Sequence, residues 1–76
     1  MKVKLFGITR DIVGGPLLEV DEITTVGELK EHMMSRYPRI KKLNSLMVAV
    51  NSEYAKDDLE LNTSDEIALI PPVSGG

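Results

Sequence analysis

Alternating apolar and polar residues at the start of the chain predict a β-hairpin. In residues 2–8, apolar side chains fall on one face of an extended segment, whereas Phe6 falls on the opposite, otherwise polar face. Residues 9–13 suit a short helical turn, and the Gly-Gly-Pro run at 14–16 is typical of a tight turn. A second strand at residues 17–20 is then expected to pair with the first.

Two later segments show the same alternation. In residues 45–51 and 66–70 alternate residues are apolar and suited to a core, and Ile70 falls on the face opposite that core. A short strand is also predicted within residues 52–56, around Tyr54. These segments bring the predicted sheet to about five strands.

One main helix is predicted between the second and third strands. Thr25 and Glu28 have the spacing of a capping box, in which the first residue caps the helix and the residue three positions on supports it. Pro38 is expected to end the helix. A single apolar helix face is formed by Val26, Leu29, Met33 and Tyr37.

The order of these elements is strand, strand, helix, strand, short strand, strand. It matches the β-grasp, or ubiquitin-like, roll, an α+β fold in which a mixed sheet packs on one main helix. The helix is expected to act as a crossover that places the third strand parallel to an earlier one. We predict a β-grasp domain over residues 1–72 and a flexible, extended C-terminal tail over residues 73–76.

Size and composition place the function on a surface or at a chain end. A 76-residue domain has a thin core and little room for a deep catalytic pocket. The net charge of −3 argues against nucleic-acid binding, which needs clustered cations. No apolar stretch approaches the length of a membrane span and no signal peptide is visible, so a cytoplasmic protein is expected. The chain has no cysteine, which excludes thiol catalysis and cysteine-based metal sites.

Side chains with ordinary catalytic chemistry are sparse. His32 is the sole histidine and lies off the apolar helix face, so we expect it to face solvent. The acidic residues Asp57, Asp58 and Glu60 suit a loop better than an acid/base pair. We therefore predict no metal site and no side-chain active site.

The C-terminal segment is the remaining candidate for chemistry. Two prolines at 71–72 stop the last strand and stiffen the chain in an extended form. Gly75 and Gly76 have no Cβ, so they can enter a narrow channel and let another backbone approach closely. A carboxylate at the end of a slim arm is suited to delivery into another protein's active site.

The sequence of residues 65–76, DEIALIPPVSGG, resembles the C-terminal signature of the small subunit of molybdopterin synthase. Three further segments are similar to that family: KVKLFG at 2–7, TVGEL at 25–29 and VAVN at 48–51. The resemblance therefore covers the whole chain in order. One departure is Ser64, where family members usually carry glycine before the last strand, and it bears on the geometry of that turn.

The resemblance implies that Gly76 carries sulfur. An E1-like adenylyltransferase would use ATP to adenylate its carboxylate, and a sulfur donor enzyme would supply the sulfur of a thiocarboxylate. That sulfur would pass, inside the molybdopterin synthase large subunit, to cyclic pyranopterin monophosphate to form the molybdopterin dithiolene. Gly75 would be a slim neck. The family also implies a heterotetramer with the large subunit, no permanently bound cofactor and no turnover by this chain alone.

A docking surface is predicted beside the tail. Phe6, Tyr54 and Ile70 belong to strands that are neighbours in a β-grasp sheet, so the three are expected to form one exposed patch. The resemblance supports this interpretation, because the family docks its partner on this face. The residues expected to contact the partner are Phe6, Tyr54, Ile70, Pro71, Pro72 and Val73.

Three alternatives share these features. A sulfur carrier for thiazole synthesis has the same fold and Gly-Gly end, although its usual endings lack Pro-Pro-Val-Ser. A ubiquitin-like protein modifier would use the same glycine to form isopeptide bonds with lysines. A plain interaction domain would have an inert tail.

Overall fold

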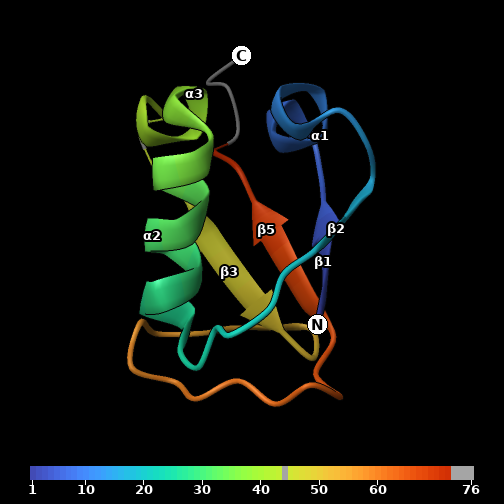
Figure 1. Ribbon diagram of the computed structural model, residues 1–76, viewed down its shortest axis with the longest axis vertical. Coiled ribbons are helices and arrows are strands. Elements are labelled where there is room, and N and C mark those ends of the chain that lie inside the picture. Colours follow the sequence, from blue (N-terminus) through green and yellow to red (C-terminus); the bar gives the residue numbers. More distant parts are fainter. Residues whose placement is uncertain (44, 73–76) are drawn as a thin grey trace.

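Helices and short strands make up the computed structural model, which describes residues 1–43 and 45–72 (Figure 1). The tail predicted at 73–76 lies outside the described residues. In chain order the elements are β1 (Lys2–Leu5), α1 (Ile8–Val13), β2 (Leu17–Glu19), α2 (Val26–Arg36), α3 (Pro38–Lys41), β3 (Met47–Val50), β4 (Glu53–Tyr54) and β5 (Ile67–Ile70).

The strands form the predicted mixed sheet. Its strand order is β2-β1-β5-β3-β4, so the first and last strands of the chain lie side by side at its centre. β1 pairs with β2 antiparallel and with β5 parallel, and β3 pairs antiparallel with both β5 and β4. β3 therefore runs parallel to the earlier strand β2, as expected for a crossover through the helix, although the two strands are not neighbours. The neighbouring strands that pair in parallel are β1 and β5. This sheet on one main helix is the β-grasp arrangement.

The first strand is shorter than the predicted segment 2–8, because Thr9 captures the backbone of Phe6. The N–H of Phe6 donates to Oγ1 of Thr9 at 3.0 Å, and the Thr9 hydroxyl donates to the carbonyl oxygen of Phe6. Gly7, the N-cap residue of α1, has a φ of 56° and a ψ of −134°, a conformation that is essentially restricted to glycine. The chain thus turns out of the sheet after Leu5.

The capping of α2 follows the predicted pattern with one shift. Oγ1 of Thr25 accepts from the N–H of Glu28 at 3.2 Å. The Glu28 carboxylate, however, accepts from Thr24, from its hydroxyl at 2.7 Å and its N–H at 3.2 Å. The hydrogen bond from the Thr24 hydroxyl, followed by that from its N–H, lowers the pKa of Glu28. These contacts fix the start of the helix.

A short helix, α3, follows α2 and was not predicted from the sequence. Helix α2 ends at Arg36, as Pro38 predicted, but Pro38 also occupies the first turn of the short helix α3. Proline is favoured there because its missing N–H has no partner in the first turn of a helix. The bend lets Ile40 of α3 enter the core.

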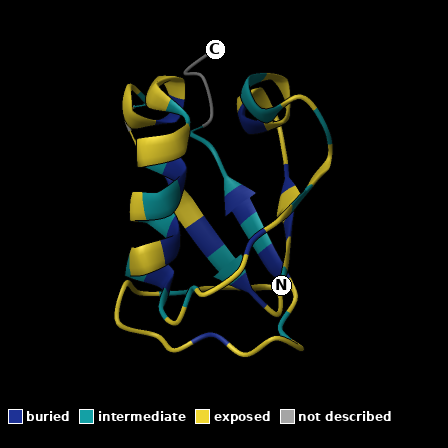
Figure 2. Ribbon diagram, in the orientation of Figure 1, coloured by how far each residue is buried: buried dark blue, intermediate teal, exposed yellow. Residues whose placement is uncertain are grey.

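The core lies between α2 and one face of the sheet (Figure 2). Val26, Leu29 and Met33 of α2 are fully buried, as their spacing predicted, whereas Tyr37 is half-buried. The sheet contributes the alternate positions of its three central strands. They are Val3, Leu5, Val48, Val50, Ile67 and Leu69.

The turn before β5 forms without the glycine that the resembling family usually carries. The N–H of Asp65 donates to the carbonyl oxygen of Asn62 at 3.0 Å, and the Asp65 carboxylate accepts from the N–H of Asn62 at 2.8 Å and from the side-chain amide of Asn51 at 3.0 Å. These two donors, Asn62 first, lower the pKa of Asp65. Ser64 does not have a positive φ, so the turn does not require glycine.

Candidate functional site

The parallel pairing of β1 and β5 places two candidate docking residues at the same end of the sheet. Leu5 pairs with Leu69, so Phe6, which follows β1, and Ile70, the last residue of β5, lie close to each other at that end. Pro71 and Pro72 continue from β5 and are half-buried. Val73, Gly75 and Gly76, the remaining predicted site residues, lie outside the described residues. The described part of the site is therefore the surface from which the tail departs.

The predicted docking residues Phe6, Tyr54 and Ile70 lie on the sheet face opposite α2. We call this face the outer face. Phe6 and Ile70 point to it because they alternate with buried neighbours, and Tyr54 does so because it pairs with Ala49, which alternates with buried Val48 and Val50. The structure thus places the three predicted residues on a single face of the sheet.

The three predicted side chains differ in the fraction of their surface that is exposed to solvent. Tyr54 is 69% exposed and Phe6 is 45% exposed, whereas Ile70 is half-buried. Two apolar residues that were not chosen from the sequence share the face: Met47, which pairs with Ile70 and is 41% exposed, and Leu17, which pairs with Lys4 and is 52% exposed. The alternation in β3 could have identified Met47. We define the apolar patch as Phe6, Leu17, Met47, Tyr54 and Ile70.

Charged groups adjoin the apolar patch on the outer face. Nζ of Lys4 forms an ion pair with the Glu66 carboxylate. The hydrogen bond from Lys4 and then its positive charge lower the pKa of Glu66. Between them and Phe6 lies a shallow hollow of about 190 Å³. The outer face thus combines apolar area with a solvent-exposed ion pair.

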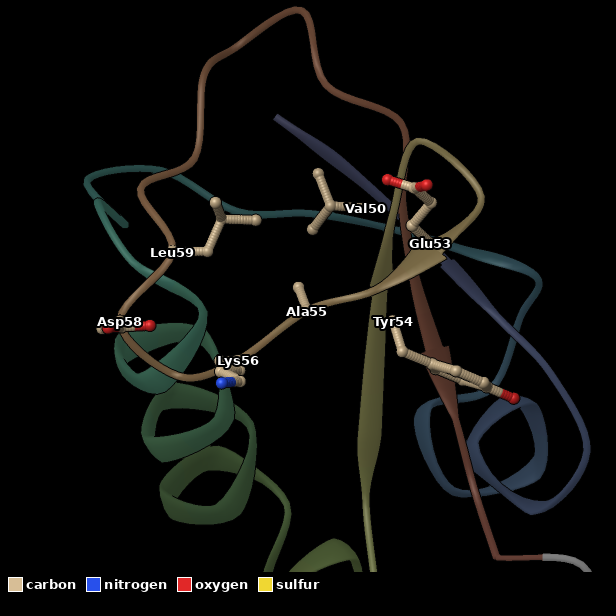
Figure 3. Close-up of a pocket in the computed structure, with 7 residues that line it drawn as sticks. All are labelled: Val50, Glu53, Tyr54, Ala55, Lys56, Asp58 and Leu59. Carbon is tan, nitrogen blue, oxygen red and sulfur yellow. The ribbon is translucent and has the colours of Figure 1, made fainter.

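A larger hollow of about 290 Å³ lies at the β4 edge of the sheet (Figure 3). Val50, Ala55 and Leu59 supply its apolar wall, and Tyr54 points away from it toward the outer face. The charged residues around it are Glu53, Lys56 and Asp58. Neither histidine nor cysteine is among its lining residues.

Other candidates for side-chain chemistry also give no site. His32 is half-buried on α2, rather than facing solvent as expected, because it lies three residues after buried Leu29 and so flanks the buried stripe. Within residues 1–43 and 45–72, no three His, Asp or Glu side chains are grouped so that they could hold a metal ion. No helix in those ranges is long and apolar enough to cross a bilayer.

Comparison with known proteins places this domain. The ThiS family matches residues 3–76. The chain belongs to that family. Its relatives include the molybdopterin synthase sulfur carrier subunits of Dictyostelium discoideum, 36% identical over 99% of this chain and 94% of the relative, and of Escherichia coli (strain K12), 35% identical over 100% and 99%.

Solved structures support the same fold. The solution structure of small archaeal modifier protein 1 from Methanosarcina acetivorans matches this ThiS-family protein with a TM-score of 0.81 and 28% sequence identity. The match covers 99% of this chain and 94% of the archaeal one. The β-grasp fold predicted from the order of elements is thereby confirmed.

Proposed function

We propose that this ThiS-family protein is the sulfur carrier subunit of a molybdopterin synthase. The observation that supports the proposal is the match to the ThiS family, which runs through Gly76, together with full-length relatives that are molybdopterin synthase sulfur carrier subunits. The absence of cysteine from the sequence is consistent with it, because the sulfur would be held on a backbone carbonyl and not on a side-chain thiol.

The proposed chemistry begins at the Gly76 carboxylate. An E1-like enzyme would join it to the α-phosphorus of ATP and release pyrophosphate, which converts a poor electrophile into an acyl-adenylate with a good leaving group. Hydrosulfide, supplied by a donor enzyme, would displace AMP and leave a thiocarboxylate. The thiocarboxylate sulfur would attack a carbon of cyclic pyranopterin monophosphate and displace an oxygen substituent from it, which gives a thioester. Water would then attack the acyl carbon, break its bond to sulfur and regenerate the carboxylate.

The outer face is the surface we assign to the large subunit. Its apolar patch includes Ile70, from which Pro71 and Pro72 lead to the tail, so docking there would bring the tail to the partner's active site. Exposed apolar clusters of this kind commonly mark protein interfaces. The same face is suited to the activating enzyme, because both reactions need access to the same terminal carboxylate. The two partners would then bind in turn.

Phe6→Ala is expected to weaken binding of the large subunit by at least about 1 kcal/mol, the usual threshold for an interface residue that matters. Titration calorimetry with the large subunit from the same organism measures the change. Leu59→Ala is the matched control, because Leu59 is 42% exposed, close to the 45% of Phe6, but lines the hollow at the β4 edge. Equal affinities of the Phe6 variant and the wild type would remove Phe6 from the interface.

Reconstitution tests the proposed function as a whole. The protein is incubated with the activating enzyme, ATP and a sulfur donor, then with the large subunit and cyclic pyranopterin monophosphate. We expect molybdopterin to form only when every component is present. Failure to form it with a folded carrier and an active large subunit would contradict the proposal.

A second candidate is a protein modifier, favoured by the structural match to an archaeal modifier protein. The same activated glycine would then acylate a lysine amine, with AMP as the leaving group. Tryptic peptides in which residues 57–76 of this chain, the fragment after Lys56, are joined to a lysine of another protein would support that function. It is compatible with sulfur transfer, because both start from the acyl-adenylate.

A further inference from the structure

The turn after β1 touches the chain segment that follows β5. A Cβ atom built on Gly7 would lie 3.1 Å from Cγ of Pro71, closer than most real Cβ contacts. The ring of Pro71 therefore lies against the Cα of Gly7, where a larger residue would have to displace it. This contact joins residues 64 positions apart, and the parallel pairing of β1 with β5 makes it possible.

The Gly7 side of this contact is rigid. Gly7 precedes α1, and its carbonyl oxygen accepts from the N–H of Arg10 at 3.1 Å. The residue before it, Phe6, is bound through both its N–H and its carbonyl oxygen by the side chain of Thr9, which is fully buried. A buried hydroxyl with both hydrogen bonds made fixes the local backbone. Pro71 thus packs against a support that does not move independently of the core.

We propose that Gly7 is a positioning residue for sulfur transfer. By holding Pro71 in place at the end of β5, it sets the direction in which the chain leaves the domain. The inference rests on the proposed function. Pro71 is five residues from Gly76. Fully extended, five residues reach at most about 17 Å, so the position at which Pro71 is held limits where the Gly76 carboxylate can lie. Misplacement of even about 1 Å can cost a reaction about 100-fold.

Replacement of Pro71 tests the contact directly. Single-turnover sulfur transfer is measured as a function of large-subunit concentration, which separates the maximal rate from the half-saturating concentration. We expect Pro71→Ala to lower the maximal rate about tenfold, because the reacting group is presented less accurately. Pro71 is also an expected partner contact, so the half-saturating concentration is measured in the same experiment, and a loss confined to that concentration with an unchanged maximal rate would contradict the inference.

Pro72→Ala is the matched control. It removes the same ring one residue further on, where the ring is not the one that lies against Gly7. Because Pro72 is itself an expected partner contact, this variant reports the loss of ring stiffness and of that contact without the loss of the Gly7 contact, and we expect its maximal rate to fall less than that of Pro71→Ala. A wild-type rate for Pro71→Ala, or an equal loss in both variants, would overturn the inference, since the second result would assign the effect to chain stiffness alone.

A double-mutant cycle separates positioning from backbone strain at Gly7. Gly7→Ala should lower the maximal rate when residue 71 is proline and lower it much less when residue 71 is alanine, because the crowded ring is then absent. Additive losses would contradict the contact. If thermal unfolding shows that Gly7→Ala does not fold, the comparison of the two proline variants decides alone. If the wild-type protein does not transfer sulfur, the proposed function is wrong. If Pro71→Ala transfers sulfur at the wild-type rate, only this inference is wrong.

Discussion

Deletion of Gly76 is expected to abolish sulfur transfer while the domain stays folded. The shortened chain ends in the carboxylate of Gly75, which lies one residue, at most about 3.6 Å of extended chain, short of the position that Gly76 would reach. The partner's active site would therefore no longer receive the reacting group. The buried hydrophobic residues of the described structure lie between Val3 and Leu69, so the core should be unaffected. Reconstituted molybdopterin synthesis measures the first effect, and thermal unfolding measures the second.

Ser74→Ala is the control for that deletion. It alters the same segment but leaves the terminal glycine in place, and we expect it to retain transfer activity. A carrier that lacks Gly76 and still transfers sulfur would show that the tail is inert. The chain would then be a plain interaction domain.

Leu69→Ala is expected to cost about 2–5 kcal/mol of unfolding free energy, the usual range for a buried leucine. Leu69 is fully buried on β5, with Leu5 and Val48 as its neighbours in the sheet. Small domains are stable by only about 5–15 kcal/mol, so this loss is a large share of the total. Urea unfolding followed by circular dichroism gives the difference directly.

Ile70→Ala separates the two faces of the same strand. Ile70 is half-buried on the outer face, so its truncation should cost less stability than that of Leu69 but weaken binding of the large subunit. Leu69→Ala should therefore mainly lower the free energy of unfolding, whereas Ile70→Ala should mainly lower the affinity for the large subunit. Similar unfolding free energies for both variants would contradict the assignment of the two faces.

Local patterns in the sequence predicted most of the fold. The alternation in residues 45–51 and 66–70 identified the buried residues of β3 and β5 correctly, because one face of each strand packs on α2. The capping box located the start of α2, since Thr25 and Glu28 interact within a single turn. Both signals depend on neighbours close in sequence, which a pattern can reveal.

Features set by tertiary contacts were harder to predict. The first strand was predicted through residue 8 but ends at Leu5, because the buried Thr9 hydroxyl binds the Phe6 backbone. The helix α3 was missed because Pro38 is both a signal for ending one helix and a favoured first residue of the next. Neither outcome can be read from the period of the apolar residues alone.

The candidate site divides in the same way. The Gly75-Gly76 ending is visible directly in the sequence, and the alternation placed Phe6 and Ile70 on the outer face. The contact of Gly7 with Pro71 was not predictable, because it depends on β1 and β5 being neighbours in the sheet. A reactive group can be recognised in the sequence by residue type. The residues that hold it in position can be identified only from the three-dimensional structure.

The most direct test of the central claim is intact mass spectrometry of the protein after incubation with the activating enzyme, ATP and a sulfur donor. The account predicts a mass increase equal to the exchange of one oxygen atom for one sulfur atom, located by fragmentation at Gly76 and absent when ATP is omitted. An unchanged mass under conditions in which the activating enzyme consumes ATP, or sulfur located at any other residue, would contradict it.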